Sequence, residues 1–452
     1  METLLERHEL DTSAETEVRV LELIGRLSDP EDPLCRKFYS ELGVPTDDEG
    51  NLREVPNLSP LTEARRPMHG HRLLLKDETS HVREFDGEVH EASSFKRRGA
   101  LLAALLAKEE NPELETLVTM SHGNHGIAVA MAAKALGMKA EVHLPKGTNE
   151  VKVQKLRDLG AHVVQEDDYA TFEDSSDGAI LSADSQGTKA KLISPFDQDE
   201  VMAGQASLVL ESVWQLQSMD KAGLIDLQNQ PIEFVFAVAG GGLITGASIL
   251  VKYFKDLGVF GDNVRVVGAQ MEDCDAARRS VEDVQAGGEG VADFSRGFNA
   301  MCDSTAVMEV GKRTLPYLSK PEYVQVIRLA REDEVGEAME QLTGIYNKMV
   351  EPAGALAYAV AHNHAAELDA PVKRSDQTLF IATVCGSNVT RETYDYFKNR
   401  AAEAYEAKTR WWSRVSRAEA IEVVWESVGD IVLTTPITNS TWSSPTAAVS
   451  RW

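Results

Sequence analysis

The sequence predicts an α/β fold in which helices cover a mostly parallel sheet. Short apolar runs alternate with helical patterns, so we expect strands at 116–120, 139–144 and 161–165 and helices at 127–136 and 150–159. Strands that alternate with helices at this spacing are typical of parallel sheets. With 452 residues, 43% of them hydrophobic, the chain is long enough for two domains with a substantial core.

The two ends of the chain carry weaker patterns. Residues 1–55 predict a helical extension, because Val20, Leu23, Ile24 and Leu27 fall on one helical face. Residues 401–452 form a tail that is too short for a full regulatory domain. For the extension we expect packing against the body or a partner subunit rather than chemistry, and the sequence assigns no role to the tail.

The remaining elements follow in chain order. The charged segment 80–91 predicts a loop near the site entrance, and residues 99–110 an Ala- and Leu-rich helix. Residues 167–190 are polar and acidic without apolar periodicity, so we expect surface structure there. Beyond residue 200 we expect helices at 206–217 and 332–349, two more helices that start near Gly246 and at Glu351, and strands at 233–238, 264–269, 324–329 and 378–384.

Composition excludes several classes of function. The net charge of −26 argues against a nucleic-acid partner. Four scattered cysteines predict neither a disulfide framework nor a zinc site. The uncharged run 234–251 is long enough to span a membrane, but its four glycines favour a buried strand, a loop and a helix. We expect no membrane segment and, without an apolar leader at the start, a cytoplasmic location.

A glycine loop follows the expected strand at 233–238. Its residues are Ala239, Gly240, Gly241, Gly242 and Leu243. Glycines expose backbone N–H groups, and a following helix adds partial positive charge, so the loop can hold a phosphate. A tight strand-to-helix turn would give the same string. The loop has neither the Gly-Lys-Ser/Thr of nucleotide-binding loops nor the Gly-x-Gly-x-x-Gly spacing of dinucleotide-binding folds.

A lysine stands in the stretch Ser94-Phe95-Lys96-Arg97, before Gly99. Most lysines are exposed helix charges. If Lys96 is buried instead, its pKa falls and it supplies the neutral amine that imine chemistry and general-base catalysis require.

A polar loop, from Ser121 to Gly126, ends one expected strand and opens a helix. Its N–H groups and the Ser121 hydroxyl suit a carboxylate. The amide of Asn124 suits a ring hydroxyl. His122 and His125 are candidate acid–base groups, although a loop histidine is more often only a hydrogen-bonding residue.

Cys385 follows the last expected strand, in Cys385-Gly386-Ser387-Asn388. Ligands of open parallel sheets bind at the carboxyl ends of strands. A thiol there can hydrogen-bond to an aromatic nitrogen without protonating it. The alternative is a small buried hydrophobic residue.

In order and spacing, these four motifs resemble the fold-type II pyridoxal-phosphate enzymes, specifically the serine/threonine dehydratase branch of the tryptophan synthase β-like superfamily. The likeness runs from about residue 59 to about 399 and includes Phe196-Asp197 and Glu351-Pro352. It implies two open parallel-sheet lobes with helices on both faces. The large cofactor-binding domain would comprise 56–98 and 200–400, and the small domain 99–199.

The resemblance also implies roles for the site residues. Lys96 would be the Schiff-base lysine, and Phe95 would pack against the cofactor ring. Residues 239–243 would bind the phosphate, Asn124 the phenolic oxygen and Cys385 the pyridine nitrogen. The substrate carboxylate would lie at the loop formed by Ser121, His122, Gly123, Asn124 and His125.

The activity implied is a β-eliminating ammonia-lyase that acts on a small amino acid such as serine or threonine, in a homodimer. His122 stands where the serine racemases have a serine, so an amino-acid racemase or β-replacement enzyme with His122 opposite Lys96 stays open. Gln270 stands about where relatives that bind a cation have a glutamate, so we expect no metal. A non-catalytic, cofactor-binding regulatory protein is a further alternative.

Overall fold

The computed structural model describes residues 12–406 apart from 48, 50, 53–58, 65–67, 80–81, 86–87, 92, 122, 147, 149, 166–171, 291–300, 308, 347–348 and 369–375. The chain divides into two units, 1–402 and 403–452, and the fold given below is that of the first unit. The predicted tail lies almost entirely outside the described residues.

The larger sheet has six strands in the order β1-β2-β12-β9-β10-β11. Its strands are β1 (Leu61–Glu63), β2 (Arg72–Asp77), β12 (Leu379–Val384), β9 (Ile232–Ala237), β10 (Val264–Met271) and β11 (Val326–Ala330). Only the β1–β2 pair among them is antiparallel, so the carboxyl ends of the other five strands meet at one edge.

The smaller sheet has four parallel strands in the order β7-β6-β5-β8. They are β5 (Thr116–Met120), β6 (Lys139–His143), β7 (His162–Val164) and β8 (Ala190–Leu192). The alternation of strands and helices expected from the sequence is therefore confirmed. The domain bounds given above stay a prediction.

Helices cover both faces of the larger sheet. Successive residues of β2 show this, because Leu74 packs in one hydrophobic cluster and Leu73 and Leu75 pack in another. The first cluster includes residues of α7 (Asp199–Lys221) and α8 (Gly242–Asp256). The second includes residues of α11 (Glu332–Tyr346) and α12 (Pro352–Glu367). Side chains that alternate between two buried faces are what a covered parallel sheet requires.

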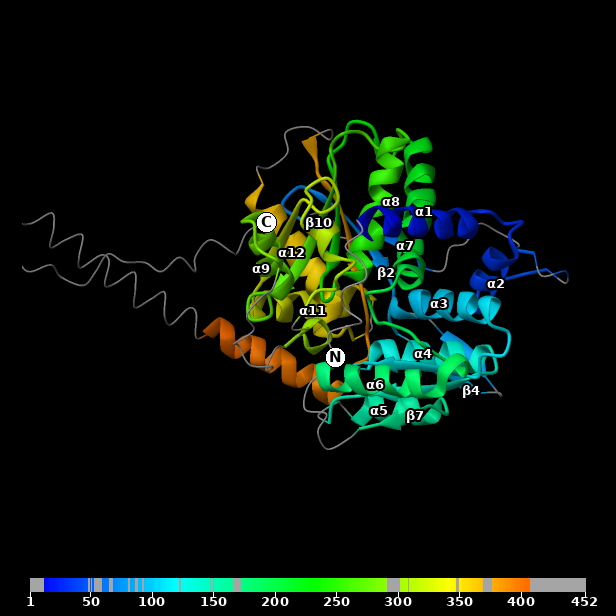
Figure 1. Ribbon diagram of the computed structural model, residues 1–452. Helices are drawn as coiled ribbons and strands as arrows, with labels where there is room; N and C mark the ends of the chain where they lie inside the picture. The colour runs from blue at the N-terminus through cyan, green and yellow to red at the C-terminus, as the bar shows by residue number, and fades with distance from the viewer. Residues whose placement is uncertain are drawn as a thin grey trace, which may run out of the picture. The chain divides into compact units, whose positions relative to one another are not determined.

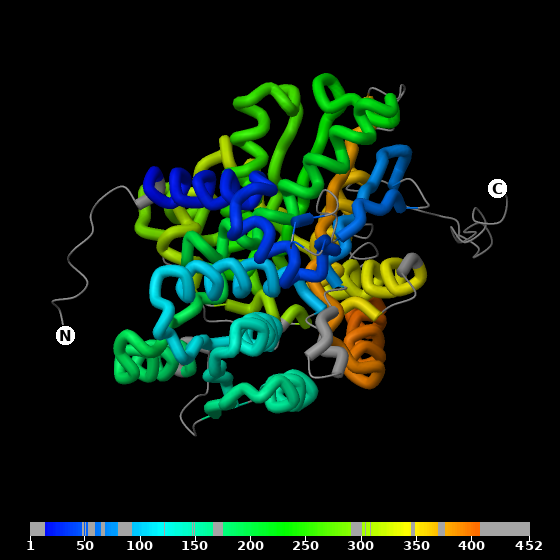
Figure 2. The backbone as a smooth tube through the Cα atoms, turned by 90° about the vertical axis from the view of Figure 1, so that its right-hand side faces the viewer, coloured from blue at the N-terminus to red at the C-terminus, as the bar shows by residue number. Residues whose placement is uncertain are grey.

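The smaller sheet is covered in the same way. On one face, Val118 and Met120 pack with residues of α6 (Phe172–Gln186). On the other, Leu117 packs in the cluster that includes residues of α3 (Lys96–Glu110) and α4 (Asn124–Ala135). In Figure 1 the helices α4, α5 (Glu150–Asp158) and α6 lie together at the bottom of the view, and Figure 2 shows the same cyan-to-green segments below the rest of the chain. The predicted fold class, with parallel sheets and helices on both faces, is confirmed.

The N-terminal extension is helical, as predicted. It consists of α1 (Thr12–Ser28) and α2 (Pro33–Leu42). The predicted face of α1 is buried, and Thr16 donates a hydrogen bond to Asp199 at the start of α7 (2.9 Å). The extension therefore packs against the body.

One segment folds differently from the prediction, and a second contains a helix that the sequence did not indicate. The charged segment 80–91 forms an antiparallel pair of strands, β3 (Val82–Phe85) and β4 (Glu88–Glu91), instead of a loop. The sequence between them is Asp-Gly, a dipeptide typical of hairpins. The polar segment 167–190 contains α6, and over residues 175–186, where burial is described, its buried residues are the small Ser175, Ala179 and Ala183. Small side chains leave little apolar periodicity to recognise.

Several helix boundaries also differ. Helix α7 begins at Asp199, well before the predicted start at 206, and α8 begins at Gly242 instead of near Gly246. Helix α3 begins at Lys96, so the motif lysine is its first residue. The uncharged run 234–251 is β9, the glycine loop and part of α8, and no described helix is long and apolar enough to cross a membrane.

Candidate active site

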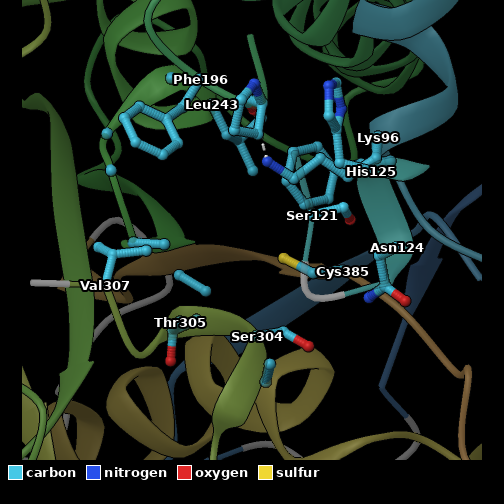
Figure 3. Close-up of a pocket in the computed structure, with 18 of the residues that line it drawn as sticks. Lys96, Ser121, Asn124, His125, Phe196, Leu243, Ser304, Thr305, Val307 and Cys385 are labelled. Carbon is cyan, nitrogen blue, oxygen red and sulfur yellow. Dashed lines mark hydrogen bonds between the residues drawn. The ribbon is translucent and has the colours of Figure 1, made fainter. Parts of the chain in front are cut away.

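One pocket lies where loops leave the carboxyl ends of strands in both sheets. Of the residues predicted for the site, it is lined by Phe95, Lys96, Ser121, Asn124, His125, the glycine loop 239–243 and Cys385. Figure 3 shows Lys96, Ser121, Asn124 and His125 around one side of the pocket and Ser304, Thr305 and Val307 on another, with Cys385 between them. Gly123 adjoins the pocket without lining it, and His122 lies outside the described residues.

Lys96 directs its amine into this pocket. Its Nζ donates a hydrogen bond to the carbonyl of Pro195 (2.7 Å) and lies 5.2 Å from the centre of the Phe95 ring. Burial lowers the pKa of the Lys96 amine from 10.5 to about 8, while the nearby Cys385 acts in the opposite direction. A substantial fraction of the amine is therefore neutral in mildly alkaline solution, as a nucleophile or base requires.

The backbone beside Lys96 is fixed to the end of β12. The N–H of Phe95 donates to the carbonyl of Cys385 (3.2 Å), and the N–H of Ser387 donates to the carbonyl of Ser93 (2.9 Å). These bonds place Lys96 and Cys385 in one pocket although 289 positions separate them in the sequence.

The glycine loop has no room for side chains. At Gly241 φ is +96°, which favours glycine, and a Cβ at Gly240 would lie 2.4 Å from the ring of Phe196. Because α8 begins at Gly242, the first N–H groups of this helix lack acceptors within the helix. The loop therefore offers an anion several backbone donors and the positive end of a helix dipole.

A turn at 311–314 orients the glycine loop. The carbonyl of Gly240 accepts hydrogen bonds from Gly311 N (3.0 Å) and Thr314 Oγ1 (2.7 Å). The same turn also contacts the residue after Phe196, because Arg313 N donates to Asp197 Oδ1 (2.9 Å). The sequence analysis did not identify Thr314, since nothing local marks it.

The loop after β5 is shaped by the Ser121 side chain. Its Oγ accepts hydrogen bonds from Gly123 N (2.8 Å) and Gly126 N (2.9 Å) in the loop that opens α4. The hydroxyl hydrogen of Ser121 remains to be donated. Gly123 has a φ of +127°, and a Cβ there would lie 2.3 Å from the Lys152 side chain, so this position requires glycine.

His125 is a neutral imidazole in the pocket wall. Burial, reinforced by Lys96, lowers the pKa of His125 to about 3. Its Nε2 lies 3.3 Å from the carbonyl of Ile193, and a carbonyl only accepts, so Nε2 carries the hydrogen. Its Nδ1 is then an acceptor, and this buried atom has no hydrogen-bond partner among the described residues. With a pKa of about 3, His125 is not suited to donate a proton at neutral pH.

Cys385 is a protonated thiol. It follows the last residue of β12, is 5% exposed, and burial raises the pKa of its thiol to about 12. Its contact with a ring nitrogen stays a prediction.

Two polar residues of the site were not predicted. Glu351, at the N-terminal end of α12, lines the pocket and accepts a hydrogen bond from Asn124 Nδ2 at its Oε1 (2.8 Å). Asn388 donates to Asn124 Oδ1 (2.9 Å). Both occur in motifs that the sequence analysis matched as strings, but their meeting with Asn124 depends on the tertiary fold. Other lining residues that the prediction missed are Pro195, Phe196, Ala237, Ser304, Thr305, Val307 and Ala353.

Within the described residues, no group of three or more His, Cys, Asp or Glu residues could hold a metal ion. The Gln270 amide bonds within the protein, since Nε2 donates to Val238 O (3.3 Å) and Oε1 accepts from Arg278 N (2.9 Å). The expected absence of a metal stays a prediction.

Comparison with known proteins identifies relatives of this chain. A biosynthetic L-threonine dehydratase of Pasteurella multocida is 27% identical over 361 residues, which cover 78% of this chain and 61% of the relative. A serine racemase of Arabidopsis thaliana is 28% identical over 271 residues, covering 60% of this chain and 72% of the relative. The crystal structure of a threonine deaminase from T.th. superposes with a TM-score of 0.57 at 31% identity, covering 74% of this chain and 93% of that one.

The chain spans about half to three-fifths of the length of several dehydratase relatives that it matches. The family described as "Pyridoxal-phosphate dependent enzyme" matches residues 53–383, which are most of the chain and include every predicted site residue except Cys385. The chain belongs to this family of pyridoxal-phosphate-dependent enzymes.

Proposed function

We propose that the chain is a pyridoxal-phosphate-dependent ammonia-lyase that eliminates the β-hydroxyl of a small amino acid such as serine or threonine, giving a 2-oxo acid and ammonia. The observation that carries the proposal is the meeting of the Lys96 amine, whose pKa is about 8, with the glycine loop in one pocket.

The residues of the pocket fit the cofactor. The glycine loop 239–243 would hold the phosphate, since side chains are excluded there and the N-terminus of α8 adjoins it. Phe95 would pack on the ring, and the Cys385 thiol would hydrogen-bond to the ring nitrogen. Lys96 would bind the aldehyde carbon through its amine.

When bound, pyridoxal phosphate supplies an electron-withdrawing ring that makes the Cα–H bond of an attached amino acid acidic. The neutral amine of Lys96 would remove the Cα proton. The Ser121 hydroxyl and the first N–H groups of α4 would bind the substrate carboxylate. Phe196, packed against Gly240, would help to exclude water.

The protonation state of Cys385 bears on the type of reaction. Its thiol keeps the proton at neutral pH, so it places no negative charge beside the ring nitrogen. Such a pocket suits a reaction in which the β-hydroxyl leaves as the Cα proton is removed. The relatives named as threonine dehydratases and an L-threonine ammonia-lyase support this choice.

The test is to reconstitute the purified protein with pyridoxal phosphate and to assay 2-oxo acid and ammonia with L-serine and L-threonine. We expect both products, and visible absorption that is lost in Lys96→Ala but kept in Lys108→Ala, at the other end of the same helix. Turnover of another amino acid only would overturn the substrate class. A wild-type protein without cofactor absorption would overturn the whole proposal, and absorption without any turnover would favour a regulatory protein.

An amino-acid racemase is the second candidate, because a relative is named as a serine racemase. A racemase would exchange the Cα hydrogen with solvent deuterium, invert the amino acid and release no ammonia. If His122 acts opposite Lys96, His122→Ala should abolish inversion and spare elimination. Chiral chromatography of the same reactions would decide between the two activities.

Assembly and location are also proposals. We propose a homodimer, on the family resemblance, and a cytoplasmic location, because all four cysteines are buried free thiols. Light scattering coupled to size-exclusion chromatography tests the first, and cell fractionation tests the second.

A further inference from the structure

Three hydrogen bonds join a lysine outside the pocket to a carboxylate inside it. Lys155 Nζ donates to Asn388 Oδ1 (2.8 Å), Asn388 Nδ2 donates to Asn124 Oδ1 (2.9 Å), and Asn124 Nδ2 donates to Glu351 Oε1 (2.8 Å). Only Asn124 and Glu351 line the pocket. Asn388 and Glu351 are 7% and 4% exposed, so water competes little for their bonds.

The chemistry of the donors fixes the direction of this chain of bonds. A lysine ammonium has donors only, so the group of Asn388 that faces it must be the carbonyl oxygen. The Asn388 amide nitrogen then faces Asn124 and requires the Asn124 oxygen as acceptor. The nitrogen of Asn124 is therefore left on the side of Glu351 and the pocket. In Figure 3 the Asn124 nitrogen lies on the side of Cys385 and its oxygen on the far side.

The bonds also cross between the two sheets. Lys155 lies in α5 and Asn124 in α4, helices that pack with the four-stranded sheet. Asn388 follows β12, which is a strand of the six-stranded sheet. Glu351 precedes α12, which is a helix that packs on that sheet. The orientation of Asn124 thus depends on contacts that hold only while these two parts stay together.

We propose that Lys155 is a positioning residue of the cofactor site: through Asn388 it orients the Asn124 amide so that an N–H group, and not the carbonyl, faces the pocket. Of the two hydrogens on Asn124 Nδ2, one is donated to Glu351 and the other is available to an oxygen of the ligand. Without Lys155, only Glu351 opposes a flip of both amides, which would present the Asn124 carbonyl to that oxygen. The inference rests on the proposed function, which places the cofactor in this pocket.

The experiment uses holoprotein variants and two readouts, the dissociation constant of pyridoxal phosphate and its visible absorption and emission spectra. Lys155→Met keeps the length of the side chain and removes its donors. We expect the dissociation constant to rise about three- to tenfold, as for the loss of one hydrogen bond, with a shift of the cofactor spectrum. Lys155→Arg, which still donates, should restore both readouts. Asn388→Asp, which cannot donate to Asn124, should reproduce the defect.

Two controls separate positioning from a general effect. Arg157→Met removes a cation from the same helix at an exposed position and should change neither readout. In an Asn124→Ala background, Lys155→Met should add nothing, because its effect passes through Asn124.

The inference is overturned if Lys155→Met retains the affinity and spectrum of the wild type, or if Arg157→Met shows the same defect. In both cases the proposed function stands. If the wild-type protein takes up no cofactor, the proposed function fails first and the inference falls with it.

Discussion

Replacing Lys96 with methionine should stabilise the cofactor-free protein. The Lys96 amine lies in the pocket with Pro195 O as its hydrogen-bond acceptor, and burial lowers its pKa from 10.5 to about 8. A group that is harder to charge in the folded than in the unfolded chain destabilises the fold while it is charged. Methionine has a similar length and no charge, so it removes this cost.

The magnitude follows from the pKa. Holding an ammonium group where its pKa is about 8 instead of 10.5 costs about 3 kcal/mol at neutral pH. Lys96 is only partly buried, so solvent screening reduces this cost. Methionine also leaves the Pro195 carbonyl without its donor, a loss of about 1 kcal/mol. We therefore expect Lys96→Met to raise the free energy of unfolding by about 1–2 kcal/mol at pH 7.

The stability advantage of Lys96→Met should depend on pH. Below pH 8 the lysine is charged in both states, and the folded chain bears the full cost. Between pH 8 and 10.5 the unfolded chain binds more protons, so the stability of the wild-type apoprotein rises with pH. The advantage of Lys96→Met should shrink over this range and disappear at its upper end.

The measurement is urea unfolding of the two apoproteins, followed by circular dichroism at several pH values from 7 to 10.5. Lys139→Met, in an exposed position of β6, controls for the general effect of removing a cation. A destabilised Lys96→Met at pH 7 would refute the reasoning. So would an advantage of the variant that is the same at every pH, because it would show that the amine is not the cause.

Three further predictions concern residues around Lys96. Thr314→Val removes the hydroxyl that holds the Gly240 carbonyl and should raise the cofactor dissociation constant about five-fold; absorbance titration measures it, and recovery in Thr314→Ser but not in Thr314→Ala is the check. Glu211→Ala leaves the buried Arg98 without one of its carboxylates and should destabilise the protein by about 3–5 kcal/mol in urea unfolding; a loss below 1 kcal/mol would contradict it. The rate at which apoprotein takes up pyridoxal phosphate should rise with pH around 8 as the Lys96 amine loses its proton, and a flat stopped-flow profile would argue against that pKa.

Most of the candidate site could be predicted from local sequence. The reason is that its parts are loops at the carboxyl ends of parallel strands, and each loop carries a recognisable string. The glycine loop follows β9 and Cys385 follows β12, and these two strands are neighbours in the sheet. The sequence indicates both strands but not their adjacency. The resemblance to a known family implied only that both motifs bind one cofactor.

Residues that support the site from a distance could not be predicted. Thr314 lies 74 positions from the Gly240 carbonyl that it holds, and Asn388 lies 264 positions from Asn124. Their residue types are ordinary in turns and loops. Only the tertiary fold shows that the Thr314 hydroxyl contacts the Gly240 carbonyl and that the Asn388 amide contacts Asn124.

The burial of charged side chains could be predicted least from the sequence. Lys76, Glu78, Arg98 and Glu211 are all completely buried, although charged residues are normally expected at the surface. They neutralise one another: Arg98 donates to both carboxylates, and Lys76 donates to Glu211 (3.1 Å). Burial acts to lower the pKa of Arg98, but the two carboxylates outweigh it and raise the pKa above its ordinary value. Each charge compensates another that is distant in sequence.

This cluster helps to hold the backbone on both sides of Lys96 in place. Arg98, two residues further along α3, is held by Glu78, whose N–H donates to the carbonyl of Val384 at the end of β12 (3.0 Å). On the other side of Lys96, the N–H of Phe95 donates to Cys385 O. The backbone is thus tied to the same strand end before and after the lysine. Movement is left to the Lys96 side chain, whose amine bonds to the Pro195 carbonyl. The role proposed for this amine, which alternates between holding the cofactor and taking a proton, requires a fixed backbone and freedom of the side chain.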